Sequence, residues 1–98
     1  MKCYIRNKDS FNAIISGTKT FEGRLYYDSW KSVKVRDIIV FIHDNNECTK
    51  TITKITLYNN ITEFCEQKKI FEYKLLFDKC YSQNRQNKYK VIILDISD

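Results

Sequence analysis

The sequence predicts an α+β fold, a small β-barrel of about five to six strands flanked by two to three short helices. Residues 38–42 and 89–96 are nearly continuous apolar runs, as in strands that are covered on both faces. Residues 48–58, rich in Thr and Ile, form a third extended segment. Such strands hide their faces and edges best in a closed or nearly closed sheet. No Pro-, Gly- or Ser-rich joint interrupts residues 1–98, so we predict a single domain.

Local signals predict where the other elements begin and end. Asp9 or Ser10 caps a first helix, and Gly17 ends it by taking the left-handed conformation. Asn60 caps a second helix, with Glu63 three residues later as in a capping box. The expected order is a strand at 3–5, a helix at 10–16, strands at 18–26, 38–42 and 48–58, helical segments from 60 and over 71–79, and a strand at 89–96.

Two further expectations concern the helical segment over 71–79. Its pattern places Leu75 and Leu76 on the inward face. The polar run at 82–87 then breaks the helical pattern.

Composition narrows the class of partner without selecting one. Seventeen Lys and Arg against twelve Asp and Glu give a formal charge of +5, which favours polyanions but is also ordinary for a small soluble domain. The four cysteines lie far apart, with no C-x-x-C and a single histidine, so we expect no zinc site and no cofactor. With no signal-peptide pattern or long apolar span, an intracellular protein, cytoplasmic or nuclear and not in a membrane, is expected. Abundant Asn, Ile, Lys and Tyr are typical of an AT-rich genome, such as that of a large DNA virus or a parasite.

Residues 16–25 hold both glycines of the chain together with three charged side chains, Lys19, Glu22 and Arg24. Strand alternation places Glu22 and Arg24 on one face. A half-buried carboxylate can accept a hydrogen bond from an exocyclic amine, and Lys and Arg can hold phosphate, so this stretch is the candidate site. The alternative is a Glu22–Arg24 pair that only solvates a strand edge.

The pattern Gly17-x-Lys19-x-x-Glu22-x-Arg24, followed by residues 33–41, resembles the ASCH domain family, with its G-x-K-x-x-E-x-R motif and a "v-G-D-x-i-x-F" turn and strand. The segments at 55–58, 61–64 and 88–94 follow in the family's order, so the resemblance covers nearly the whole chain. It implies a PUA-like β-barrel with a cleft for RNA or a nucleoside-like ligand. Gly17 and the three charged residues of the motif would line that cleft.

The chain departs from the family in two places. Arg36 stands where the family has glycine, which either alters a left-handed turn or adds a positive group at the rim of the cleft. Some small relatives resemble amidohydrolases that deacetylate N4-acetylcytidine with a Lys, a Thr three residues later and a distal Glu. Here Lys19 keeps its place, Glu22 replaces the Thr, and the distal acid is either Glu63 or Glu66.

Three functions remain open from the sequence. The first is a module that binds RNA or a modified nucleotide through Lys19, Glu22, Arg24, Gly17 and Arg36. The second is a metal-independent hydrolase of a nucleoside amide or RNA, in which Lys19 acts as base or oxyanion partner and Glu22 activates water. The third is a regulatory module that binds an unknown protein partner, with the aromatic loop at 26–30 as one contact.

Overall fold

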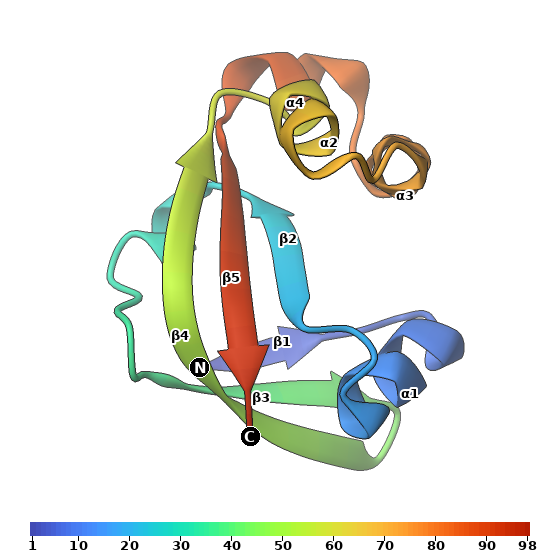
Figure 1. Cartoon of the computed structure of the whole chain (residues 1–98), viewed down its shortest axis with the longest axis vertical. Helices are drawn as coiled ribbons and strands as arrows, with labels where there is room; N and C mark the ends of the chain where they lie inside the picture. The colour runs from blue at the N-terminus through green and yellow to red at the C-terminus, as the bar shows by residue number, and fades with distance from the viewer. The chain divides into compact units, whose positions relative to one another are not determined.

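The computed structural model describes residues 1–98 as five strands, four α-helices and one 3-10 helix (Figure 1). In chain order these are β1 (Lys2–Tyr4), α1 (Lys8–Ser16), β2 (Phe21–Leu25), η1 (Asp28–Trp30), β3 (Ile38–His43), β4 (Asn46–Tyr58), α2 (Ile61–Lys68), α3 (Glu72–Cys80), α4 (Gln83–Lys88) and β5 (Val91–Ser97). The strands belong to one sheet of order β1-β3-β4-β5-β2. The predicted α+β class is confirmed, with one α-helix more than expected. No helix has the length and apolar character needed to cross a membrane.

Contacts group the chain into two compact units, which are described separately. The first comprises Met1–Glu22, Val33–Ile55 and Leu94–Asp98, and the second comprises Gly23–Ser32 and Thr56–Ile93.

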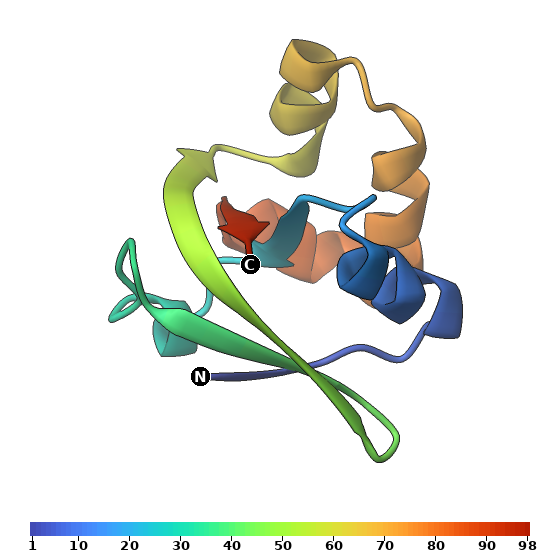
Figure 2. The same cartoon turned by 60° about the horizontal axis from the view of Figure 1, so that its bottom comes forward.

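The first unit is built on the β3–β4 hairpin, which Figure 2 shows beside the N-terminal strand. The hairpin is antiparallel, with Ile39 opposite Lys50, and β1 pairs in parallel with β3, with Cys3 opposite Phe41. Because alternate residues of a strand share a face, Ile39 and Phe41 point the same way, and both are fully buried. Phe11 and Ile14 supply the buried face of α1.

Helix α1 begins earlier than predicted. The side chain of Asn7, not that of Asp9 or Ser10, is the N-cap, and its Oδ1 accepts a hydrogen bond from the Ser10 amide at 3.0 Å. The end of the helix is as predicted. Gly17 has a φ of 80°, and its amide donates to the carbonyl of Ile14, which closes the last turn.

The second unit contains helices α2, α3 and α4. Asn60 caps α2 as predicted, because its side chain accepts from the amide of Glu63 at 2.8 Å. The predicted inward face of α3 is wrong, since Leu75 and Leu76 are 64% and 43% exposed. Tyr73 and Phe77 are buried instead. These two aromatic residues, four positions apart, bury more apolar area than the two leucines would, and that decides which face of α3 is covered.

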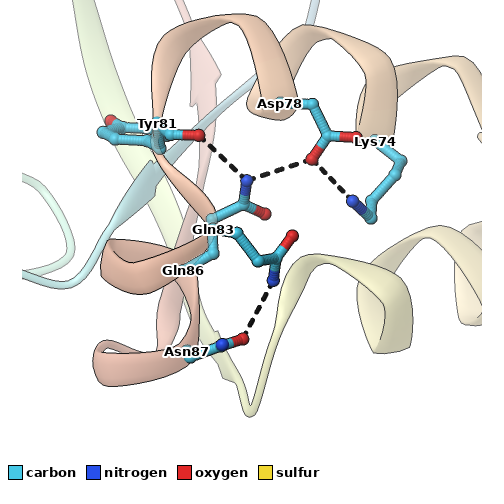
Figure 3. A network of polar contacts seen from close by, with 6 residues as sticks. All are labelled: Lys74, Asp78, Tyr81, Gln83, Gln86 and Asn87. Atoms are coloured by element: carbon cyan, nitrogen blue, oxygen red, sulfur yellow. Dashed lines mark hydrogen bonds and ion pairs between the residues drawn. The ribbon is translucent and has the colours of Figure 1, made fainter.

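The polar run at 82–87 forms helix α4, which the sequence analysis did not predict. Ser82 begins it as N-cap, with its Oγ accepting from the amide of Arg85 at 3.3 Å. Gln86 is buried, and its amide donates to Asp78 Oδ1 at 3.0 Å and to the carbonyl of Tyr81 at 3.1 Å (Figure 3). Helix α4 is therefore held in place by a buried polar side chain. It lacks the apolar periodicity by which a helix is predicted from sequence.

Candidate functional site

The loop at 17–20 is held in place by backbone hydrogen bonds inside the first unit. The Lys19 amide donates to the carbonyl of Ala13 in α1 at 3.0 Å, and the Ile96 amide of β5 donates to the carbonyl of Thr20 at 2.9 Å. The loop is therefore tied at one end to α1 and at the other to β5. This fixes where the side chain of Lys19 starts.

The structure brings Lys19 and Glu22 together. Lys19 Nζ donates to Glu22 Oε2 at 3.4 Å. The carboxylate side chain is 5% exposed and that of the lysine 17%. Taking a carboxylate out of water is costly unless it is paired and hydrogen-bonded, so the ammonium group of Lys19 offsets part of that cost. A carboxylate buried to this degree is not a solvent-exposed group at a strand edge, which was the alternative interpretation of Glu22.

A hollow of about 210 Å³ opens beside this pair, and all of its lining residues belong to the first unit. They come from the loop after α1, from β4 and from the end of β5, and are Gly17, Lys19, Thr20, Lys50, Ile96, Ser97 and Asp98. The hollow thus contains two residues of the predicted site, Gly17 and Lys19. It also contains a second lysine that the sequence analysis missed.

Lys50 is the missed residue. It lies in β4 on the same face as the buried Ile52 and opposite Ile39, and its side chain is 4% exposed. Its ammonium group forms an ion pair with the carboxylate of Asp98, whose side chain is 92% exposed. The available signal was strand alternation, which places this lysine on the inward face of the extended segment at 48–58.

Arg36 keeps the left-handed turn that a glycine would favour. Its φ is 81°, and its amide donates to the carbonyl of Ile52 at 2.7 Å. The Arg36 side chain is exposed and is not among the residues that line the hollow. Its role as a ligand contact stays a prediction.

Arg24 lies in the second unit, where its positive charge acts on Tyr81. Burial raises the pKa of the Tyr81 phenol, and the guanidinium of Arg24 opposes that rise by favouring the phenolate. The Tyr27 ring packs edge-on against Tyr89, with centroids 4.6 Å apart, and its hydroxyl is buried without a hydrogen-bond partner in the chain. The second unit thus places a cation among tyrosines.

Gly23 allows a side chain to approach the backbone closely. A Cβ at this position would lie 2.9 Å from a ring carbon of Tyr73. A glycine within a strand often marks a bulge or the close approach of a ligand or another backbone, and here a tyrosine ring occupies the space.

The two candidate distal acids both lie in α2. Glu63 accepts a hydrogen bond from Asn59 at 2.9 Å at the start of that helix, and Glu66 is exposed. Neither has a geometry that selects it as an acid partner. No group of three or more His, Cys, Asp or Glu side chains is arranged to hold a metal ion.

Comparisons with known proteins identify the family. The model of the ASCH domain matches residues 7–98. The fold is similar to the crystal structure of the hypothetical protein PH0355, with a TM-score of 0.80, 22% identity, and coverage of 99% of this chain and 98% of that one. It is also similar to the solution structure of protein PF0455 from Pyrococcus furiosus, with a TM-score of 0.69, 22% identity, and coverage of 99% and 96%. No functionally curated protein matches. The expected α+β, PUA-like class is thereby confirmed, and because the family model spans residues 7–98, this chain belongs to the ASCH domain family.

Proposed function

We propose that this protein is an RNA- or nucleotide-binding module whose ligand contacts include Lys19, Glu22 and Arg24. The observation that carries the proposal is the buried Glu22 carboxylate, paired with Lys19 at 3.4 Å, with the lysine on the wall of an open hollow. A carboxylate in such a place is fixed in position and can accept hydrogen bonds from the exocyclic amine of a base.

Arg24 supplies the second part of the proposed recognition. A guanidinium group suits phosphate or a base edge, because its planar fork donates two parallel hydrogen bonds. The Tyr81 ring, on which the Arg24 charge acts, and the Tyr27 ring packed against it add aromatic surface. The formal charge of +5 supports a polyanionic ligand.

The geometry favours binding over hydrolysis. Glu22 Oε2 already accepts a hydrogen bond from Lys19 Nζ, which holds the carboxylate as a fixed hydrogen-bond acceptor. The place of the amidohydrolase Thr is taken by this glutamate. Release of acetate from N4-acetylcytidine, or cleavage of labelled RNA, above the level of a Glu22→Gln variant would favour hydrolysis over binding.

Fluorescence anisotropy with a short single-stranded RNA at low salt tests the proposal. We expect Lys19→Ala and Arg24→Ala each to weaken binding roughly tenfold, because each removes a charge-assisted hydrogen bond. We also expect each to reduce the steepness of the salt dependence, since fewer counterions are released.

Matched controls remove the same charges elsewhere. Lys54→Ala changes an exposed lysine of β4, and Arg85→Ala changes an exposed arginine of α4. Both are expected to cost far less affinity than the site variants. Equal losses in all four variants would indicate binding by net charge alone, and no binding by the folded wild type would refute the proposal.

A further inference from the structure

We infer that Lys50 is a phosphate-binding residue, and that the carboxylate of Asp98 occupies the position of the phosphate as an intramolecular competitor. The inference rests on the proposed function in that the phosphate is taken to be part of a nucleotide or of an RNA backbone. Lys50 lies outside the G-x-K-x-x-E-x-R motif. The fold places it on the same hollow as Lys19 and Gly17.

Lys50 is a buried lysine with an apolar neighbour. Its side chain is 4% exposed, and its neighbour across the hairpin, Ile39, is fully buried. A lysine at such a position is desolvated, and an apolar residue of similar volume would serve stability as well or better. The buried ammonium group of Lys50 therefore requires an anion that pairs with it in the folded protein.

The partner of Lys50 is an exposed carboxylate. Asp98 is the residue that forms an ion pair with Lys50, yet the aspartate side chain is 92% exposed. An exposed side chain is held by little besides this ion pair and keeps much of its rotational freedom. Phosphate oxygens accept the same hydrogen bonds from an ammonium group as carboxylate oxygens do, so phosphate can replace Asp98.

The hollow is small and has two lysines in its lining. Its volume of about 210 Å³ is below the range of roughly 300–1,000 Å³ typical of sites for whole drug-sized ligands, so it suits one group of a larger ligand. Its charged lining residues are Lys19, Lys50 and Asp98, and the hydroxyl groups of Thr20 and Ser97 add neutral donors. When Asp98 leaves, two ammonium groups face the incoming anion, and Glu22 remains paired with Lys19.

The test compares wild type with Asp98→Asn, Lys50→Met and the double variant, titrated with inorganic phosphate and followed by the amide NMR signals of residues 17 and 50. Chloride keeps the ionic strength constant. We expect Asp98→Asn to bind phosphate roughly tenfold more tightly, because the competing carboxylate is gone. In the double variant this gain is expected to disappear. Lys54→Met, at an exposed position of the same strand, is expected to leave phosphate binding unchanged.

Either of two results overturns the inference. One is an Asp98→Asn variant that binds phosphate no more tightly than wild type, and the other is a double variant that retains the gain. If Asp98→Asn is less stable, thermal unfolding supplies a second measurement. Phosphate should then raise its midpoint more than that of wild type, because only the folded state binds the anion.

Adenosine monophosphate and the labelled RNA identify the source of the phosphate and separate this inference from the proposed function. The inference is supported if the binding of either ligand changes in the Lys50 and Asp98 variants. The ligand whose binding changes is then the source of the phosphate. RNA binding that is lost in Lys19→Ala, with binding of both RNA and adenosine monophosphate unchanged in Lys50→Met, refutes the inference and leaves the proposed function in place. Phosphate binding that requires Lys50, in a protein that binds neither RNA nor nucleotide, supports the site and refutes the proposed function.

Discussion

The amide of Gly23 donates a hydrogen bond to the hydroxyl of Tyr73 at 3.1 Å, so a residue of β2 is joined to α3 within the second unit. The Tyr73 ring also packs against Phe64 and Phe77, with centroids 5.8 and 5.9 Å away. Gly23 is thus a packing position, where the missing side chain makes room for a ring that is held from two other sides.

Gly23→Ala should therefore lower the free energy of unfolding by about 1–3 kcal/mol, because the added methyl group overpacks the space that the Tyr73 ring fills. Urea unfolding followed by circular dichroism measures the loss. Gly17→Ala is the comparison: its new Cβ would meet nothing within 4 Å, so only the left-handed backbone is strained, at about 1 kcal/mol. An unchanged urea midpoint for Gly23→Ala would show that the close approach is absent in solution.

Lys19→Met should destabilise the protein by about 1–3 kcal/mol, because it leaves the buried Glu22 carboxylate without its ammonium partner. Glu22→Gln in the same background should recover part of the loss, since an amide needs no counter-charge. Chemical denaturation of the two single variants and the double variant gives the coupling energy. A coupling energy of zero would contradict the ion pair.

Arg24→Gln should raise the pKa of Tyr81 further above its ordinary value, because the positive charge that favours the phenolate is removed. The measurement is a pH titration of the Tyr81 ring carbon next to the hydroxyl by NMR, assigned with Tyr81→Phe. Arg85→Gln is expected to shift this pKa less.

Tyr81 also links stability to pH. Its pKa is raised in the folded state, so the unfolded chain loses the phenolic proton first as the solution becomes alkaline. The contribution of Tyr81 is fully present below the unfolded value of about 10 and is lost as pH rises through the folded value. Tyr81→Phe should reduce this loss of stability at alkaline pH. An equal fall of the free energy of unfolding with pH in both proteins would contradict this role of Tyr81.

Ser82→Ala should destabilise α4 by about 1 kcal/mol, because the Arg85 amide loses its cap. Hydrogen exchange of the α4 amides should quicken. Gln86→Ala should cost more, since it leaves the Tyr81 carbonyl and one Asp78 oxygen with fewer donors. Asn84→Ala, at an exposed position of the same helix, is expected to change little.

Local and repeating signals of the sequence predicted much of the fold. The strands around 38–42, 48–58 and 89–96, the cap at Asn60 and the end of α1 at Gly17 are all present. These features follow from backbone sterics, hydrogen bonding of neighbouring residues and strand alternation, which act over a few positions. The motif also singled out Lys19 and Glu22 as site candidates, and the structure shows these two residues, three positions apart, as an ion pair.

Tertiary packing decided what these local signals left open. Helix α4 depends on Gln86, whose partners Asp78 and Tyr81 lie in or beside another helix, and the buried face of α3 depends on aromatic neighbours. In the sequence, Lys50 is an ordinary polar residue of a strand. Only the fold places it beside Asp98, 48 positions away. Such pairings depend on which distant segments meet, and the sequence around one residue carries no information on that.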